Sequence, residues 1–323
     1  MARVAGLGMN VPERILSNAD LEKMVDTTDE WIITRTGIKE RRIADNGVSA
    51  SQLAIPAALE ALERAGVAPA QLDMIICATS TPDMMFPSTA CFIQNGIGAR
   101  GCAAFDLLAA CSGFVYGLTV ADKFIKSGAA KNILLVSSEI FSHIVDWKDR
   151  STCVLFGDGA AAAVITAGNG PSGVMDSRIF ADGSYGDLLY AGVGSANPAH
   201  ALYKDGATQF VKMKGNNLFK IAVTLMADVC RSILADNGLT AEDVSIVIPH
   251  QANVRIINAV AKALGMPEEK LFVNVQKYGN TSAVTVPLAM YEAQKEGRLR
   301  EGDLVLLVAF GGGLTWGASL LRW

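Results

Sequence analysis

Cys111 lies among small and apolar residues, in the stretch LLAACSGFVYG at residues 107–117. A thiolate is the nucleophilic form of cysteine, and unpaired N–H dipoles at a helix N-terminus lower its pKa. Small neighbours would also let a substrate and a backbone N–H approach the sulfur closely. The stretch therefore predicts either a nucleophile at the start of a helix or a thiol that only packs in the core.

Two other polar residues stand at expected ends of elements. His250 comes directly after an apolar run and a proline in IVIPHQANVRII, which predicts a position at the end of a strand. Asn280, in KYGNTSA, precedes a helix-forming run and is of a type preferred at a helix N-cap. Taken singly, the histidine could be structural and the asparagine could be only a cap. A functional interpretation needs a reason for the residues to meet.

An internal repeat supplies that reason. Residues 62–80 resemble residues 234–252, and each segment predicts a helix, a glycine cap, a turn and a buried strand. NILLVSSEI…FGDGAAAAVIT likewise resembles LVLLVAFGGGLTWGASLL, with Phe156 placed on Phe310. Both matches run in the same order along the chain, which indicates a duplicated unit.

A third match concerns the polar residues directly. Residues 110–128 align without a gap with residues 279–297, so Cys111 and Asn280 would occupy equivalent helix starts. His250 would close a strand, and working groups in such sheets lie at the carboxyl ends of strands. If the two halves pack about a pseudo-twofold axis, all three side chains can meet at their junction.

The repeat also predicts the fold. We expect two α/β halves, residues 1–172 with the nucleophile and residues 173–323 with the histidine and asparagine. Apolar strand runs that alternate with amphipathic helices favour mainly parallel sheets covered by helices. No linker-like segment separates the halves, so they should share one long core.

The composition restricts the class of protein. The 323 residues are 50% hydrophobic and 19% charged with a net charge of −4, which predicts a globular enzyme without general affinity for nucleic acid or an anionic membrane. We see no charged leader with a long apolar run, and no apolar run reaches the ~18 residues of a spanning helix. The six cysteines lack the spacing of metal ligands. We expect a cytoplasmic protein with reduced thiols and no bound metal.

Seven motifs along the whole chain resemble the thiolase superfamily and, within it, the β-ketoacyl-acyl-carrier-protein (ACP) synthase III family: DEWIITRTGIKERRIA, AACSGF, FGDGAAA, MKGNNLFK, PHQANVRII, GNTSA and AFGGGLTWGA. This resemblance implies thiolase-like duplicated α/β halves that form a layered αβαβα core with pseudo-twofold symmetry. The catalytic set of the family is cysteine, histidine and asparagine, which falls on Cys111, His250 and Asn280. These are the residues that the repeat brings together.

The resemblance implies a condensing acyltransferase that initiates type II bacterial fatty acid synthesis and needs no cofactor besides its substrates. Cys111 would take an acyl group from a short acyl-CoA. His250 Nε2–H and the Asn280 amide would stabilise the enolate that forms when malonyl-ACP loses CO2. The N–H groups of Cys111 and Gly312 would form the oxyanion hole during the Claisen condensation to 3-oxoacyl-ACP.

Matching positions also imply how the substrates bind. The adenine ring of CoA would stack between an indole and a guanidinium. The implied CoA contacts are Thr27, Trp31, Arg35, Arg150, Gly215 and Asn253. By sequence alone, Trp31 could instead be a core residue and Arg35 a solvated charge.

Partner proteins are implied as well. Lys220 and Arg255 match positions that dock the acidic carrier protein, and Lys214, beside Lys212, is added for its local charge. Phe86 would reach the acyl pocket of the partner subunit in a homodimer. The apolar pair Met84-Met85 before it is flexible, so the preferred acyl chain stays open, as does primary or specialised metabolism.

One motif departs from the family pattern. After GNTSA the family usually has a small residue and serine, whereas this chain has Val284 and Thr285. We expect this change to alter helix packing behind the site and to leave the chemistry untouched.

Other activities remain as alternatives. A starter-unit ketosynthase of a specialised polyketide or lipid pathway would share every motif. A biosynthetic thiolase would need a second cysteine in AFGGGLTWGA, and an elongating ketosynthase would have histidine in place of Asn280. A non-catalytic CoA- or acyl-binding scaffold would not need the complete Cys/His/Asn set. A cysteine hydrolase would need a peptide groove that the sequence does not indicate.

Overall fold

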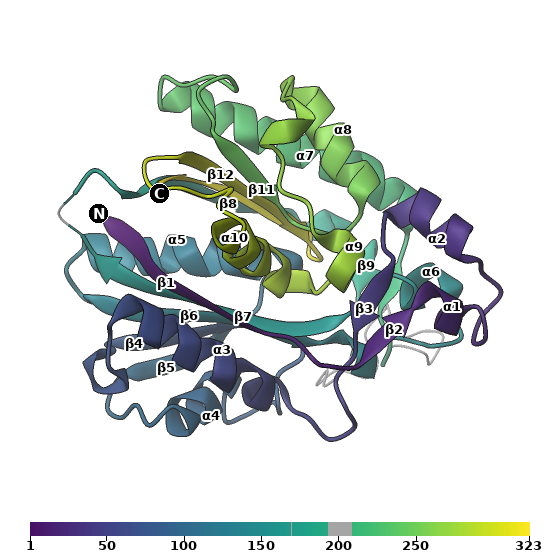
Figure 1. Cartoon of the computed structure of the whole chain (residues 1–323), viewed down its shortest axis with the longest axis horizontal. Coiled ribbons are helices and arrows are strands. Elements are labelled where there is room, and N and C mark those ends of the chain that lie inside the picture. Colours follow the sequence, from purple (N-terminus) through teal and green to yellow (C-terminus); the bar gives the residue numbers. More distant parts are fainter. Residues whose placement is uncertain (169, 193–208) are drawn as a thin grey trace.

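The structure, a computed structural model, describes residues 1–168, 170–192 and 209–323. Two large β-sheets form its frame (Figure 1). The first sheet has the strand order β1 (Ala2–Asn10), β7 (Asp158–Ala167), β6 (Asn132–Ile140), β4 (Met74–Ala78), β5 (Ala103–Leu107). The second has the order β11 (Ile246–Pro249), β12 (Leu304–Gly311), β13 (Thr315–Arg322), β8 (Gly173–Ala181).

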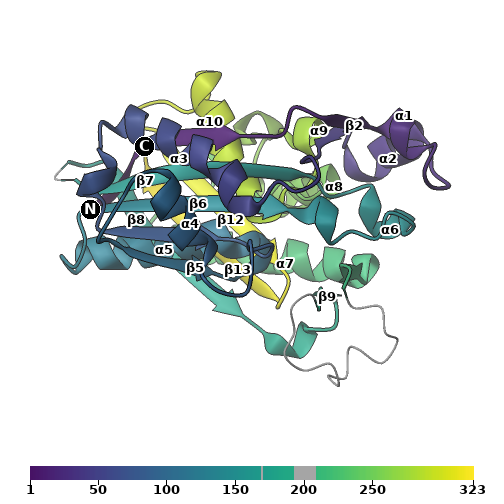
Figure 2. The same cartoon turned by 90° about the horizontal axis from the view of Figure 1, so that it is seen from below.

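Helices form three layers around these sheets, which confirms the expected αβαβα arrangement. The central layer contains α5 (Gly113–Lys126) and α10 (Thr285–Lys295), which share one apolar cluster with strands of both sheets. The outer face of the first sheet, on the viewer's side in Figure 2, is covered by α3 (Ala50–Ala65) and α4 (Thr89–Gly96). The outer face of the second sheet is covered by α7 (Gly215–Asp236) and α8 (Val254–Leu264).

The strand directions differ from the mainly parallel arrangement that we expected. Among the described strands of the two large sheets, three pairs are parallel and four are antiparallel. The prediction was wrong because an apolar strand shows only that both of its faces are buried, and not which way its neighbour runs. β12 and β13, for example, are joined by a short turn at residues 312–314 and are therefore antiparallel.

The two sheets repeat one strand pattern. β11, β12, β13 and β8 take the places of β4, β6, β7 and β1, and Leu271 forms an isolated parallel bridge with Val247 where a fifth strand would lie. Strands of the first sheet come from residues 2–167, and strands of the second come from residues 173–322. This separation supports our proposal that the chain consists of two halves, residues 1–172 and 173–323.

The helix starts near the site do not align as the gapless repeat predicted. α5 begins two residues after Cys111, whereas α10 begins five residues after Asn280. Each helix follows a 3-10 turn, η2 (Ala110–Ser112) or η7 (Ser282–Val284), and the first residue of the turn has a φ of 45° or 53°. In the fold Cys111 therefore corresponds to Ala283, and Asn280 lies in the loop before the turn.

A shortened helix explains this error. α5 has 14 residues and α10 has 11. Three residues are nearly one helical turn, so the apolar faces stay in phase and a gapless alignment conceals the deletion. Phe156 and Phe310 are not equivalent either, because Phe156 precedes β7 whereas Phe310 lies in β12.

A set of short elements, which we call the end layer, covers one end of the two sheets (Figure 1). It comprises β2 (Ile15–Ser17), α1 (Asn18–Leu21), α2 (Asp29–Thr36), β3 (Glu40–Arg42), α6 (Arg150–Cys153), β9 (Leu189–Tyr190), β10 (Lys212–Met213) and α9 (Val275–Tyr278). Other single 3-10 turns are η1 (Pro69–Gln71), η3 (Phe141–His143), η4 (Gly183–Tyr185) and η6 (Glu268–Lys270).

Buried Arg41 of β3 joins separate segments of the end layer to one another. Its guanidinium donates to Leu16 O at 3.1 Å and Asn18 Oδ1 at 2.8 Å within the end layer. It also donates to Val154 O at 2.7 Å, directly after α6. These three acceptors are oxygens of backbone carbonyls and an amide rather than a carboxylate, and the full burial of the side chain lowers the pKa of Arg41 to about 10.

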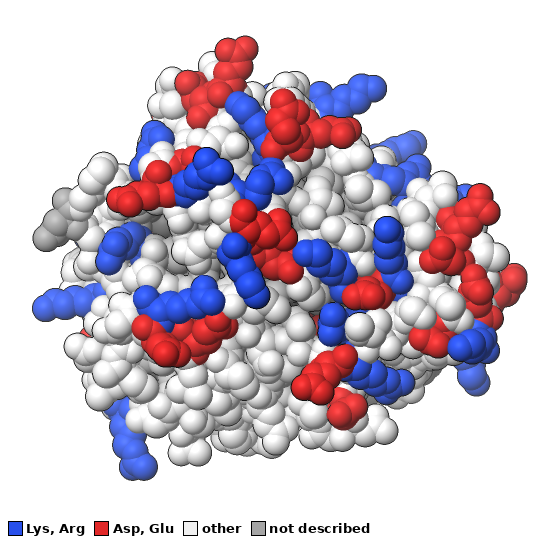
Figure 3. Space-filling view, viewed as in Figure 1, with Lys and Arg blue, Asp and Glu red and all other residues white. Residues whose placement is uncertain are grey.

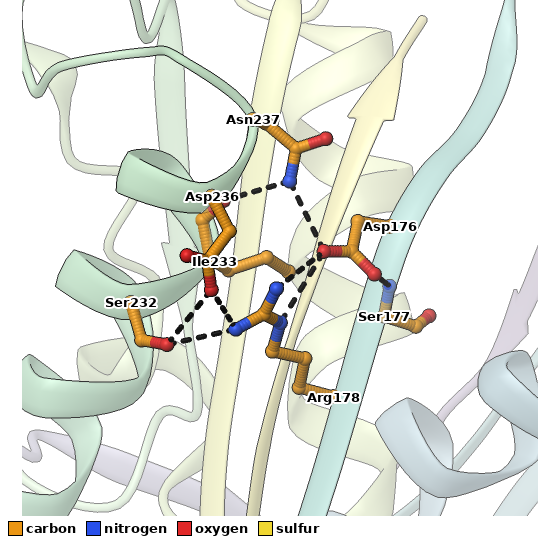
Figure 4. Close-up of polar contacts among 7 residues, drawn as sticks. All are labelled: Asp176, Ser177, Arg178, Ser232, Ile233, Asp236 and Asn237. Carbon is orange, nitrogen blue, oxygen red and sulfur yellow. Dashed lines mark hydrogen bonds and ion pairs between the residues drawn. The ribbon is translucent and has the colours of Figure 1, made fainter.

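A second cluster holds the C-terminal end of α7 against β8 (Figure 4). Arg178 of β8 pairs with Asp176 at 3.2 Å and with Asp236 of α7, and it donates to Ser232 Oγ at 2.8 Å. Asn237 donates to the same Asp176 carboxylate at 3.0 Å. These contacts fix one end of α7 on the second sheet, while its other end reaches the cavity between the end layer and the sheets.

Candidate active site

A cavity of about 640 Å³ brings residues from both halves together. Cys111, His250 and Asn280 all line it, so the structure places the three predicted catalytic side chains in one space. Each is buried, with 4%, 4% and 6% of its surface exposed. Six further predicted residues line the same cavity: Trp31, Arg35, Gly215, Lys220, Asn253 and Arg255.

Close backbone packing holds the turn that carries Cys111. A Cβ atom on Gly311 would lie 2.6 Å from the Cys111 backbone nitrogen, so glycine is needed for this approach. Thr315 Oγ1 lies 2.9 Å from Ala109 O and 3.2 Å from Gly312 O, which links the turn to the glycine-rich segment. Gly312, the predicted second donor of the oxyanion hole, therefore lies beside the turn of the nucleophile.

Burial determines the protonation of Cys111. It raises the pKa of the thiol to about 12, and the Ser282 hydroxyl and the amide of Cys111 itself offset only part of this rise. The expectation that a helix start lowers this pKa is therefore wrong for the resting site. Cys111 is a neutral thiol there.

His250 is held on two sides. Its backbone N–H donates to Val308 O at 2.8 Å, which keeps it beside β12. Its ring nitrogen Nδ1 lies 2.6 Å from Thr285 Oγ1, at the start of α10. Burial lowers the pKa of the imidazole to about 3, so the ring is neutral near pH 7.

Asn280 is fixed by its backbone and by its side chain. Its N–H donates to Leu155 O at 2.8 Å, and its carbonyl accepts from Gly157 N at 3.1 Å. Its Oδ1 accepts from Ser282 N at 2.8 Å. The amide is thereby oriented with its oxygen occupied, which leaves Nδ2 as the group that can donate to a bound molecule.

The outer part of the cavity carries the predicted nucleotide-binding residues. The guanidinium carbons of Arg150 and Arg35 lie 5.1 Å and 5.5 Å from the centre of the Trp31 ring. Thr27 does not line the cavity, and its buried Oγ1 has no hydrogen-bond partner in the described part of the chain. Asn253 caps α8 through Arg255 N and donates to Arg35 O at 3.0 Å, so its side chain also joins α8 to α2.

Four other predicted residues do not line the cavity: Gly312, which lies beside the turn of Cys111, and Lys214, Phe86 and Arg150. Lys214 forms an ion pair with Asp187 at 2.5 Å, which offsets its charge. Phe86 is 79% exposed and does not line the cavity of its own chain. Arg150 stays at the mouth, where it also donates to Asp26 O at 2.6 Å.

Sequence reasoning missed the hydroxyl residues Ser282, Thr285 and Thr315 behind the site. The sequence predicted only a packing change at Thr285, whereas its hydroxyl contacts the ring of His250. The available signal was that each of these residues lies within or next to a motif that also carries a candidate residue. Their role depends on which turns lie together in space, and the sequence does not give this.

Comparisons with known proteins agree with this geometry. The sequence model of the family described as 3-Oxoacyl-[acyl-carrier-protein (ACP)] synthase III matches residues 105–183, and that of its C-terminal part matches residues 234–323. The curated β-ketoacyl-[acyl-carrier-protein] synthase III of Aquifex aeolicus is 53% identical over 321 residues, covering 99% of both chains. That of Roseiflexus sp. is 53% identical over 323 residues, covering 100% of this chain and 98% of the relative.

Solved structures show the same likeness. The crystal structure of the 3-oxoacyl-[acyl-carrier-protein] synthase III from Aquifex aeolicus has a TM-score of 0.94 at 53% identity and covers 100% of both chains. The priming β-ketosynthase from the R1128 polyketide biosynthetic pathway has a TM-score of 0.92 at 34% identity, covering 99% of this chain and 96% of its own. With full-length identity of this degree, the chain belongs to the β-ketoacyl-acyl-carrier-protein synthase III family.

Proposed function

We propose that this protein is the condensing enzyme that initiates type II fatty acid synthesis by joining an acyl group from a short acyl-CoA to malonyl-ACP. The observation that carries the proposal is the meeting of Cys111, His250 and Asn280 in one cavity of a chain from this family. A priming role in a specialised pathway is less well supported. The two curated synthase III relatives are 53% identical to the chain, whereas the polyketide priming enzyme is 34% identical.

Acylation of Cys111 is the first half-reaction. The sulfur attacks the thioester carbonyl of acyl-CoA, the bond to the CoA sulfur breaks, and the thiol proton passes to the departing sulfur. The N–H groups of Cys111 and Gly312 stabilise the tetrahedral oxygen. The half-reaction leaves S-acyl Cys111 and free CoA.

Condensation is the second half-reaction. The thioester carbonyl of malonyl-ACP accepts hydrogen bonds from His250 Nε2–H and Asn280 Nδ2, which stabilise the enolate as CO2 leaves. The enolate carbon attacks the acyl carbonyl on Cys111, cleavage of the carbon–sulfur bond releases 3-oxoacyl-ACP, and the departing Cys111 sulfur takes up one proton from solvent to restore the thiol. His250 is uncharged near pH 7, so it can donate this hydrogen bond without first losing or gaining a proton. We expect the two substrates to suffice without a cofactor, and we expect the protein to act in the cytoplasm.

The outer cavity would bind CoA. Adenine would insert between the Trp31 ring and the Arg150 guanidinium, which already stack on each other. Arg35 would contact a phosphate, and Thr27 has an unpartnered hydroxyl to offer the adenine. Gly215 and Asn253 line the same cavity as Cys111, and we propose that they contact pantetheine.

The mouth of the cavity would dock the acidic carrier protein. Lys220 and Arg255 line it, and the Arg255 guanidinium lies 5.7 Å from the Phe219 ring. Lys214 contributes less to this surface because Asp187 offsets its charge. We therefore base the docking proposal on Lys220 and Arg255.

We also propose a homodimer built around Phe86. Phe86 and Leu108 are 79% and 77% exposed, and β5, next to Leu108, is an edge strand of its sheet. Large apolar side chains that are exposed close to an edge strand are typical of a protein interface. Asp83 fixes the loop by accepting from the Ser51 N–H at 2.8 Å, so Phe86 is presented on a held segment.

Intact-mass spectrometry with acetyl-CoA tests the function. The wild-type chain, His250→Ala and Asn280→Ala should each gain one acetyl group, and Cys111→Ser should gain none. The His250 and Asn280 variants should lose malonyl-ACP decarboxylation by roughly a hundredfold or more, because each lacks one enolate donor. No mass gain with any short acyl-CoA, or a gain that survives in Cys111→Ser, would contradict the proposal. A panel of acyl-CoAs would identify the primer.

A further inference from the structure

Glu139, near the end of β6, is a fully buried carboxyl that the reaction described above does not use. Its Oε2 accepts hydrogen bonds from Ser80 N at 3.0 Å and from Thr81 Oγ1 at 2.8 Å. Its other oxygen, Oε1, is buried and has no hydrogen-bond partner in the described part of the chain. A buried carboxylate oxygen without a partner is costly, so this oxygen indicates a further contact of Glu139.

Ser282 of η7 has the matching property. Its Oγ is also buried and without a hydrogen-bond partner among the described residues. The η7 turn packs against both β6 and the η2 turn that carries Cys111. Burial raises the pKa of Glu139 and of Cys111, and the Ser282 hydroxyl offsets part of both rises, which places it next to both side chains. Ser282 therefore links the thiol to the carboxyl.

The backbone of the turn does not require this hydroxyl. In the corresponding turn η2, Ala110 takes the place of Ser282, and the two residues have φ values of 45° and 53°. Alanine therefore adopts the positive φ of this position without a side-chain hydrogen bond. The oxygen of Ser282 is available for a task outside its own turn, and Ser282→Ala should keep the turn intact.

Glu139 can accept and release a proton near neutral pH. Burial raises the pKa of its carboxyl to about 7, and hydrogen bonds from Thr81, Ser80 and the η7 turn oppose a larger rise. A proton acceptor is most effective when its pKa lies close to the working pH. Cys111 needs such an acceptor when it attacks a substrate, because its thiol is neutral in the resting protein.

The charged groups around Glu139 leave this capacity in place. Cys77 of the neighbouring strand β4 is fully buried, and burial raises the pKa of its thiol, with further rises from Asp106, Glu139 and Asp83. Cys77 is therefore a neutral thiol that adds no charge beside Glu139. Above pH 7 Glu139 becomes a carboxylate, so its ability to accept a proton increases with pH.

We propose that Glu139 accepts the proton of Cys111 through the Ser282 hydroxyl when the sulfur attacks acyl-CoA, an arrangement that we call the proton relay. The S–H bond breaks and its proton binds Ser282 Oγ, while the hydroxyl proton of Ser282 binds Glu139 Oε1. The electron pair of the sulfur forms the bond to the acyl carbon. Glu139 then loses its proton to solvent as the CoA sulfur gains one, so the net transfer is the one given above. The proposal deepens the proposed function and rests on it.

Single-turnover acylation at several pH values tests the relay. In the wild-type protein, the rate should rise about tenfold per pH unit below pH ~7 and level off between pH ~7 and ~8, as Glu139 becomes a carboxylate. Glu139→Gln should acylate roughly a hundredfold more slowly at pH ~7. Its rate should keep rising through pH ~8, because the thiol must then ionise without an acceptor. Intact-mass spectrometry of samples quenched after mixing with acetyl-CoA measures both profiles.

Two further variants and a second reaction complete the test. Ser282→Ala should slow acylation as much as Glu139→Gln, because it removes the link. Alkylation of Cys111 by iodoacetamide at pH ~9 uses the free thiolate. Glu139→Gln removes a negative charge near that thiolate and should be alkylated at least as fast as the wild type. Asp122→Asn is the matched control, because Asp122 of α5 is also fully buried and pairs with Lys123 at 3.0 Å. Its acylation rate should stay at the wild-type value.

The outcomes separate the relay from the proposed function. A Glu139→Gln variant with the wild-type rate and pH profile contradicts the relay, and so does a Ser282→Ala variant that acylates at the wild-type rate. Equal slowing of acylation and alkylation in Glu139→Gln also contradicts it, because this result shows a purely structural role. In each of these cases the proposed function stands. A wild-type chain that gains no acyl group from any short acyl-CoA contradicts the proposed function instead.

Discussion

Burial acts in opposite directions on the two titratable groups of the site. It raises the pKa of the Cys111 thiol to about 12 and lowers the pKa of the His250 imidazole to about 3. Both groups are therefore neutral in the resting protein, and the site holds no thiolate–imidazolium pair. Loss of the thiol proton must accompany attack on the substrate, because a free buried thiolate is costly.

The raised pKa of Cys111 makes its alkylation strongly pH-dependent. Because only the thiolate reacts, and because its pKa lies well above the working pH, the reactive fraction should rise about tenfold per pH unit. We expect the iodoacetamide rate at Cys111 to keep rising from pH 7 to 10. Peptide mass spectrometry after timed alkylation measures it, with a free thiol such as N-acetylcysteine as reference. A plateau below pH 8 would show a stabilised thiolate and contradict this description.

At the scale of elements, the sequence predicts which residues are buried better than it predicts how the elements are oriented and aligned. Apolar runs and helical periods predict the layers well, because burial depends on composition along an element. The predicted strand direction was wrong, because strands with both faces buried have similar sequences in parallel and antiparallel pairs. The equivalence of Cys111 with Asn280 was also wrong, because a loss of one turn from α10 leaves its periodicity intact.

In the candidate site as well, some residues could be predicted from the sequence and others could not. Cys111, His250 and Asn280 could be predicted because each lies in a recognisable motif close to the end or the start of an element. Thr285 and Thr315 could not, because they act on residues far away in the chain, at His250 and Ala109. Only the packing of turns brings such pairs together.

The loop that carries Phe86 allows a test of the dimer. Phe86→Asp places a charge in the proposed interface, so the molecular mass in solution should fall from twice the chain mass of 34.1 kDa toward a single chain. Light scattering after size exclusion measures this change. Leu59→Asp is the control, since Leu59 is also exposed but lies on α3. A dimer that survives Phe86→Asp, or a wild-type monomer, would count against the interface.

At the scale of the whole molecule, charge is distributed rather than concentrated. Positive and negative side chains are interspersed over the face in Figure 3, and the net charge is −4. No helix among the described residues is long and apolar enough to cross a membrane, and no cluster of metal-binding side chains occurs in them. An acidic partner would therefore have to recognise a local basic surface.

Reversing one charge at the cavity mouth tests that surface. Arg255→Glu should raise the KM for malonyl-ACP about tenfold, and rising salt should reduce the difference because it screens exposed charges. Arg231→Glu is the control, since Arg231 is exposed on α7 and already pairs with Asp228. Steady-state kinetics at two ionic strengths measure both variants. Acylation by acetyl-CoA that falls as much as carrier-dependent turnover would remove the docking role.

The paired turns η2 and η7 show how duplicated copies of one structure can diverge. Both keep a residue with positive φ at the same place, Ala110 in one and Ser282 in the other. The first copy has the sulfur of Cys111 at the next position, where it lines the cavity, whereas the second has Ala283 there, fully buried and facing Gly113. In the second copy, the position that corresponds to Cys111 is therefore held by Ala283, which packs against the start of α5. In the proposed reaction, one copy would supply the reacting sulfur of Cys111, and the other copy would supply the groups of His250 and Asn280 that stabilise charge.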